Sequence, residues 1–232
     1  MSLDPKLLDH LAAFDTPTLC NALEIVVPER RGHGYTSQPF VCAFPSLKPI
    51  VGFARTATVR AREPATRPAA EMRAQRLGYY EYVAGGDGPH IVVIQDIDDE
   101  PGYGAFWGEV NTAVHRGLGV LGCITNGSIR DMDMIATGFQ LLAGRIGPSH
   151  AFVHLESFGE PVTVHGMPVA HGDLIHADRH GAVVIPHDAV AKIPAAVDLL
   201  ARREAVIIGA SKQPGFSIER LRQAFKEQED IH

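Results

Sequence analysis

An acidic residue and an arginine–aspartate pair in the middle of the chain are the residues best suited to chemistry. Glu109 follows Gly108 in a glycine turn, and Arg130 and Asp131 form an adjacent pair that begins twenty-one positions after Glu109. The sequence between them predicts a helix over residues 110–116 and an apolar strand over residues 120–125. A helix followed by a strand returns the chain to its starting point. Both turns can therefore meet at one end of a sheet, where open α/β folds bind their ligands.

The residue types at these two turns suit a small acid with a 2-oxo group. The free amides of Val110 and Asn111, at the start of a helix, favour a carboxylate or an oxyanion. Arg130 can hold a carboxylate in a bidentate manner, and Asp131 is an oxygen ligand for Mg²⁺ or Mn²⁺, with waters completing the coordination. Glu109 can hold one of those waters and act as an acid/base relay. The alternative is that Arg130 and Asp131 form a solvated ion pair at a helix start.

The composition is that of an ordinary globular protein. The 232 residues are 45% hydrophobic and 21% charged, and the formal net charge is −6. This acidic balance argues against a nucleic-acid partner, and no apolar run is long enough to cross a membrane. Three scattered cysteines and an N-terminus without a signal-peptide pattern predict a cytoplasmic protein.

Hydrophobic periodicity and turn residues divide the chain into helices and strands. We predict one domain over residues 1–232, with N-terminal helices in 3–25, a core over about 50–186 and C-terminal helices in 187–228. Helices alternate with strands first, and a strand-rich block follows, which predicts a layered α/β domain with two sheets. The predicted core strands are 51–61, 90–96, 120–125, 140–143, 151–155, 162–164, 174–176 and 182–185. The predicted helices are 3–14, 69–83, 110–116, 187–203 and 218–228, together with a second N-terminal helix capped by Asp15 or Thr16 and a short helix that ends at Gly138.

Six of the twelve histidines fall between positions 150 and 180. On a strand over residues 151–155, His150 and His154 would share one face, and either can contact a distal carboxylate of the substrate. The alternative is that both are surface or interface residues. His176, Asp178 and His180 have a spacing that suits a transition metal on a strand, but Gly181 favours a turn there, and a structural role is the preferred interpretation.

The central segment GEVNTAVHRGLGVLGCITNGSIRDMDMI resembles the signature of the RraA-like family, in which an acid precedes an Arg-Asp pair by twenty intervening residues. Further resemblance is found in DTPTLCNAL, GFARTATVRA and VTVHGMPVAHGDLIHADRHGAVVIP, so that it covers most of the chain. The family includes class II 4-hydroxy-4-methyl-2-oxoglutarate/4-carboxy-4-hydroxy-2-oxoadipate aldolases. It also includes regulators of ribonuclease activity.

The resemblance implies a three-layer swivelling β/β/α domain with flanking N- and C-terminal helices, assembled as a homotrimer or homohexamer. It implies that Arg130 holds the pyruvoyl carboxylate and that Asp131 anchors Mg²⁺ or Mn²⁺, mostly through water. The backbone at Gly108, Val110 and Asn111 would complete the substrate pocket. Glu109 stands where the aldolases often have Asp, as the acid that holds the catalytic water.

The expected function is thus a divalent-metal-dependent lyase that cleaves or decarboxylates 2-oxo acids through a pyruvate enolate. His154 is the nearest candidate for the basic side chain that the family's aldolases place after the Arg-Asp turn. The alternative is a non-catalytic regulator that binds a protein such as a ribonuclease. The regulators include members that lack the Arg-Asp pair, which this chain keeps, so the resemblance favours an enzyme.

Overall fold

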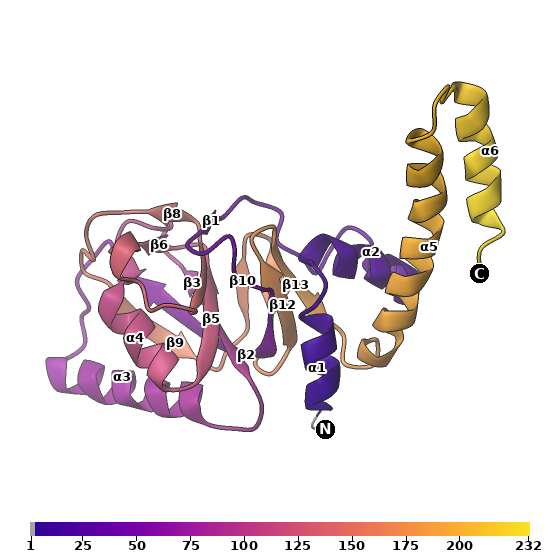
Figure 1. Cartoon of the computed structure of the whole chain (residues 1–232). Helices are drawn as coiled ribbons and strands as arrows, with labels where there is room; N and C mark the ends of the chain where they lie inside the picture. The colour runs from indigo at the N-terminus through magenta and orange to yellow at the C-terminus, as the bar shows by residue number, and fades with distance from the viewer. Residues whose placement is uncertain (1–2) are drawn as a thin grey trace.

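An eight-stranded, curled sheet forms the centre of the molecule in the computed structural model, which describes residues 3–232 (Figure 1). Four neighbouring strands, β2, β3, β5 and β7, run parallel to one another. β1, β9, β12 and β13 join this parallel core through antiparallel pairs. The strands of this sheet are β1 (Val41–Cys42), β2 (Ile50–Arg60), β3 (His90–Asp96), β5 (Val120–Thr125), β7 (Gln140–Ala143), β9 (His154–Phe158), β12 (Leu174–Asp178) and β13 (Gly181–Ile185).

Two smaller groups of strands accompany the central sheet. β4 (Ala105–Trp107), β6 (Ser128–Ile129) and β8 (Arg145–Ile146) form a short parallel sheet. β10 (Val162–Val164) and β11 (Met167–Val169) form an antiparallel hairpin.

Alternation along β3 shows how the layers are arranged. Val92 and Ile94 pack in a cluster with side chains of α3 (Ala69–Ala84) and of the short parallel sheet. Ile91 and Val93 point the other way, into a cluster that includes the β10–β11 hairpin. Successive strand residues face opposite sides, so an unbroken apolar strand is buried on both faces. The predicted mixed α/β fold, with helices and a second set of strands layered on a sheet, is confirmed.

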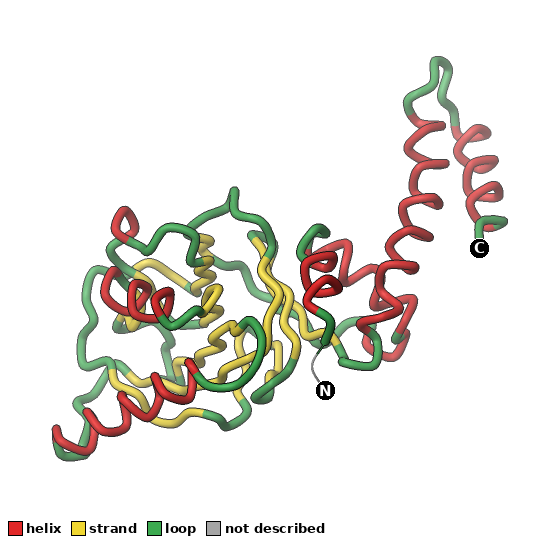
Figure 2. Tube along the Cα trace, turned by 60° about the horizontal axis from the view of Figure 1, so that its bottom comes forward, coloured by secondary structure: helices red, strands yellow, loops and turns green. Residues whose placement is uncertain are grey.

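The flanking helices lie at one end of the sheet (Figures 1 and 2). α1 (Pro5–Leu11), α2 (Thr16–Val26) and the first turns of α5 (Ile193–Ser211) share a core with β12 and β13. The rest of α5 projects from the body as an arm, and α6 (Ile218–Glu229) packs against it (Figure 2). The predicted N- and C-terminal helices are therefore present.

A buried polar network fixes the start of α2. Asp15 caps the helix by accepting a hydrogen bond from the Thr18 amide, as predicted. Asp178 accepts bonds from the amides of Thr16 and His180, and His176 lies 3.0 Å from the Thr16 hydroxyl. The His176–His180 segment thus has the structural role that was preferred for it over a metal site.

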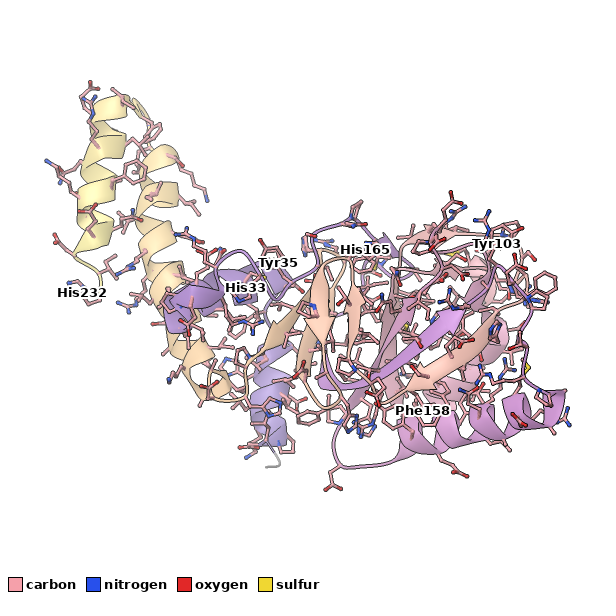
Figure 3. The ribbon with its side chains drawn as sticks, turned by 180° about the vertical axis from the view of Figure 1, so that it is seen from behind. His33, Tyr35, Tyr103, Phe158, His165 and His232 are labelled. Atoms are coloured by element: carbon pink, nitrogen blue, oxygen red, sulfur yellow. The ribbon has the colours of Figure 1, made fainter. Side chains whose placement is uncertain are left out.

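Three elements depart most from the prediction. The strand expected over 151–155 is β9 at His154–Phe158, because Ala151, with φ +45°, belongs to a turn. Phe158 at its far end lies against α3 (Figure 3). After Asp131 the chain forms only a 3₁₀ turn, Met132–Met134. The long C-terminal helix begins at Ile193 rather than 187, since residues 187–192 form turns and the 3₁₀ segment Val190–Lys192.

No helix within residues 3–232 is both long enough and apolar enough to cross a membrane. The single-domain organisation over 1–232 stays a prediction, and residues 1 and 2 of that span lie outside the described part of the chain. A single cooperative unfolding transition would test it.

Candidate functional site

The short parallel sheet brings the two predicted turns together. β4 ends at Trp107 and β6 ends at Ile129, and the two strands pair in parallel. The Arg130 amide donates a hydrogen bond to the Trp107 carbonyl over 2.9 Å. Gly108 and Arg130 therefore leave the same edge of one sheet side by side, which is how residues more than twenty positions apart become neighbours.

Gly108 is required because Asp131 approaches its backbone closely. A Cβ at position 108 would lie 2.5 Å from Asp131 Oδ2 and 3.2 Å from Arg130 Cγ. Real Cβ atoms do not approach other atoms to 2.5 Å, so an alanine would displace the aspartate. The backbone at Gly108 is extended, with φ −166°, so the requirement concerns space rather than conformation.

Helix α4 (Glu109–Gly117) begins at this turn with an open N-terminus. Its N-cap residue, Gly108, provides no side-chain cap, and the first hydrogen bond of the helix runs from the Thr112 amide to the Gly108 carbonyl. The Glu109 amide donates to Asp131 Oδ2 over 3.3 Å. The amides of Val110 and Asn111 cannot bond within the helix, because helix geometry leaves the first N–H groups without a partner. Together with the helix dipole, they provide a site for an anion.

The Asn111 side chain holds this helix start in position rather than facing a ligand. Its Nδ2 donates to the Phe106 carbonyl, and its Oδ1 accepts from the Tyr80 hydroxyl over 3.1 Å. Burial raises the pKa of Tyr80, and the nearby Arg76 guanidinium opposes that increase. The Tyr80 hydroxyl thus acts as a neutral donor that links α3 to α4.

Arg130 and Asp131 contact each other but are both accessible. Arg130 Nε lies 3.6 Å from Asp131 Oδ2, and the side chains are 37% and 30% exposed. Asp131 has φ +56° and ψ +43°, in the left-handed region that residues other than glycine seldom adopt. Aspartate tolerates this conformation better than most residues, and such strain is concentrated at functional sites.

A cavity of about 350 Å³ opens above the helix start. Gly108, Glu109, Val110, Asn111 and Arg130 all line it, and Asp131 lies directly beside them. The predicted backbone and side-chain groups are therefore brought to one place. Their roles there remain predictions.

Three further polar residues line the cavity, and none of them was assigned from the sequence as a principal ligand. Arg76 and Tyr80 come from α3, and His150 comes from the turn before β9. Residues 76 and 80 are one helical turn apart, so the helical spacing already placed them on one face, but nothing local showed which surface that face meets. His150 Nδ1 lies 2.7 Å from the Ala151 carbonyl, so that nitrogen donates; Nε2 can donate to a carboxylate when the ring is protonated.

His154 does not line this cavity. Its Nε2 lies 2.8 Å from Glu156 Oε1, and its Nδ1 lies 2.7 Å from the Phe152 carbonyl. The side chain faces a neighbouring cavity of about 260 Å³ that shares Arg76 with the first. Both of its ring nitrogens are thus engaged, and within one chain His150 is the histidine that reaches the Arg130 cavity.

A buried histidine supports the far end of α4. His115 is fully buried beside Trp107, with 4.5 Å between the ring centroids. Its Nδ1 lies 2.6 Å from the Asn111 carbonyl, and its Nε2 lies 2.8 Å from the Tyr79 hydroxyl. Burial lowers the pKa of His115 to about 4, so the ring is neutral at pH 7.

The residues present fit a cation that keeps most of its water. No group of three or more His, Cys, Asp or Glu side chains within residues 3–232 is placed to enclose a metal ion. Mg²⁺ is commonly held by one or two carboxylates together with waters and substrate oxygens. Asp131, with Glu109 beside it, provides a donor set of that kind.

Several solved structures share the fold. One is an uncharacterized protein from Pseudomonas syringae pv. tomato str. DC3000, with 22% identity, a TM-score of 0.70 and coverage of 96% of this chain and 95% of the other. Another is RraAS2 from Streptomyces coelicolor, described as an unusual member of the RNase ES inhibitor RraA protein family. It has 20% identity, a TM-score of 0.68 and coverage of 92% of this chain and 99% of the other. At these identities the likeness shows the fold alone.

A comparison with curated proteins finds no significant match. The family model described as RraA-like, Aldolase/RraA, matches residues 16–184, which include the whole sheet except the last residue of β13 and all the cavity-lining residues. The match spans well over half of the chain and confirms the resemblance seen in the sequence. The chain belongs to the RraA-like family.

Proposed function

We infer that the protein is a divalent-metal-dependent lyase that cleaves or decarboxylates 2-oxo acids. The family contains both aldolase-type enzymes and ribonuclease regulators, so membership alone does not select an activity. The observation that carries the proposal is the convergence of an uncapped helix start, Arg130 and a strained Asp131 on one cavity. A protein-binding surface has no need for that combination.

The charges of the cavity favour a substrate with two acidic groups. Arg130 and the free amides at the start of α4 would hold the carboxylate next to the 2-oxo group. Arg76 lines the same cavity from α3, and His150 lines it from the turn before β9. The guanidinium groups of Arg76 and Arg130 balance the acids Glu109 and Asp131, so a bound divalent cation would leave the cavity with an excess of positive charge. We therefore assign the distal carboxylate to Arg76, with His150 as a second contact.

Asp131, assisted by Glu109, would hold Mg²⁺ or Mn²⁺. When bound, such a cation supplies Lewis-acid stabilisation of the negative charge that develops on the 2-oxo oxygen. The protein residues do the rest: Arg130 orients the carboxylate and the α4 amides fix its plane. Glu109 is exposed at the helix start and is placed to hold a water molecule and pass a proton to or from it.

Self-association as a trimer or hexamer is part of the proposal. Val110, at the mouth of the cavity, is 72% exposed although it is apolar. Tyr103, in the loop before β4, also projects from the body (Figure 3). Exposed large apolar side chains are typical of surfaces that a partner covers. A second copy of the chain would then close the site.

A pyruvate-release assay tests the function. Oxaloacetate and 4-hydroxy-2-oxo diacids are each supplied with Mg²⁺ or Mn²⁺, and a parallel reaction contains EDTA. We expect pyruvate formation that EDTA abolishes and added metal restores. Arg76→Gln should raise the KM for a diacid at least tenfold. It should change the KM for a 4-hydroxy-2-oxo monoacid less than twofold.

The regulator alternative makes the opposite prediction. The fold neighbour from Streptomyces coelicolor is described as a member of a ribonuclease-inhibitor family, so a ribonuclease is the partner to test under this alternative. Absence of lyase activity with every 2-oxo acid and metal, together with ribonuclease inhibition that the Asp131→Ala variant retains, would replace the lyase proposal with the regulator.

A further inference from the structure

Arg55 is a buried cation that pairs with no acid in the described part of the chain. It lies in β2 and is 6% exposed. Its Nη2 donates to the Gly85 carbonyl over 2.5 Å and contacts His90 Nε2 at 2.6 Å. None of the ion pairs within residues 3–232 includes Arg55. A buried charge is costly unless an opposite charge accompanies it, so this guanidinium lacks its usual compensation.

The groups around Arg55 do not supply a negative charge. A guanidinium can only donate hydrogen bonds, so His90 Nε2 must accept, and the imidazole is neutral. Burial and the Arg55 charge lower the pKa of His90 and also that of His171. The Tyr82 ring lies 5.8 Å from Arg55 Cζ, and its hydroxyl is 2.8 Å from His171 Nδ1. The groups in direct contact with Arg55 are therefore neutral.

The same guanidinium faces a cavity of about 330 Å³. Arg55 Nη1 has no hydrogen-bond partner among the described residues. This atom is accessible rather than fully enclosed by the protein. Asp87 also lines the cavity, from an exposed glycine loop, but it forms no ion pair with Arg55. His187 lies at the rim, where its Nε2 is 3.2 Å from the Gly172 carbonyl. Most of the remaining wall is apolar: Leu3, Pro5, Leu8, Phe53 and Pro89.

We propose that this cavity binds a small carboxylate with an apolar body. The carboxylate would pair with Arg55, and the body would lie against Leu8 and Phe53. The site is separate from the Arg130 cavity. The two cavities lie beyond opposite ends of β3. His90, beside Arg55, is the first residue of this strand, whereas the Arg130 cavity is formed around the ends of β4 and β6, beyond its last residue. The proposal does not depend on the lyase function.

Benzoate is the probe, and benzamide is its uncharged control. Titration calorimetry should show benzoate binding at least tenfold tighter than benzamide. Crystals soaked in 4-bromobenzoate should show the bromine by anomalous scattering in the cavity beside Arg55. Arg55→Met should reduce benzoate affinity at least tenfold, whereas Arg130→Met, which alters the other cavity, should change it less than twofold. No benzoate binding by the wild type, equal binding of benzamide, or bromine only at Arg130 would overturn the proposal.

A second pair of variants covers the case in which Arg55→Met fails to fold. Leu3 lines the cavity mouth near the N-terminus and leaves the bonds of Arg55 untouched. Leu3→Asp places a negative charge at the mouth and should weaken benzoate binding at least fivefold. Leu3→Asn, of the same size without the charge, should weaken it less than twofold. Equal effects of the two variants would refute pairing between the carboxylate and Arg55.

Discussion

Acid should weaken the folded protein through His115. This residue is fully buried between α3 and α4, and its ring is held in one tautomer. Nδ1 faces the Asn111 carbonyl and must donate, so Nε2 accepts from the Tyr79 hydroxyl. Burial lowers the pKa of His115 from 6.5 to about 4. The unfolded chain therefore takes up this proton at a higher pH than the folded chain.

The sign and size of the effect follow from that difference. Between pH 6.5 and about 4 the unfolded state binds more protons, so the free energy of unfolding falls as the pH falls. At about 1.4 kcal/mol for each pKa unit, the difference between the two pKa values corresponds to a loss of about 3 kcal/mol in the free energy of unfolding once both states are protonated. Over the accessible range from about pH 7.5 to about pH 5, the same relation gives a loss of about 2 kcal/mol.

Urea unfolding at about pH 7.5 and about pH 5 measures this loss. His115→Gln removes the titrating group, and His33→Gln is the matched control at an exposed position. Burial also lowers the pKa of His90 and His176, and both remain in every variant. We expect the wild type and His33→Gln to lose about 2 kcal/mol more than His115→Gln on acidification. Equal losses in all three proteins would refute the assignment of this pH dependence to His115.

Three substitutions test the candidate site. Arg130→Ala should lower kcat/KM by the equivalent of about 2 kcal/mol, mainly by raising KM, because it removes a charged contact made by a side chain that is 37% exposed. Unchanged steady-state kinetics would remove Arg130 from the site. Asp131→Ala should lose activation by Mg²⁺ and Mn²⁺, measured as the ratio of rates with metal and with EDTA. Gly108→Ala should lower kcat/KM about tenfold with little change in Tm, because its Cβ displaces Asp131 while the backbone stays unstrained; a matched Gly117→Ala variant, where the Cβ meets open space, should keep full activity.

The central strands could be predicted because their sequences are apolar without interruption. β3, β5 and β7 begin and end where the pattern placed them. Each is buried on both faces, so nearly every residue carries the signal. The alternation along β2 and the turn residues before β10 were similarly informative, whereas β11 was not predicted.

The pairing that builds the site was not predictable from the sequence. β4 and β6 have three and two residues, too few for any period to show. Their partners are set by tertiary packing, in which Trp107 and Ile129 join the core beneath α3. The sequence placed both turns at one end of a sheet, but it assigned them to the edge of the main sheet. The small second sheet is what brings them into contact.

The histidines show a second limit of sequence reasoning. His150 and His154 were expected on one strand face, and the positive φ of Ala151 ends that relation. The chain turns at this point, so His150 reaches the Arg130 cavity and His154 is held by Glu156. A left-handed alanine has no signature in composition or hydrophobic pattern. Arg76 was missed for a related reason, because an exposed helix residue does not indicate which loop will lie opposite.

The strain at Asp131 offers a way to separate chemistry from architecture. A residue other than glycine in the left-handed region costs about 1 kcal/mol or more, and glycine removes that cost. The extra freedom of glycine in the unfolded chain costs about 0.5–1 kcal/mol, so Asp131→Gly should leave the free energy of unfolding within about 1 kcal/mol of the wild type. The carboxylate that glycine lacks binds the Glu109 amide at 3.3 Å and Arg130 Nε at 3.6 Å, and both interactions are long and partly exposed. If Asp131 holds the metal, the same variant should have no lyase activity. An inactive protein of nearly unchanged stability would mean that the strain serves function, whereas a clearly less stable protein would mean that Asp131 mainly holds the two turns together.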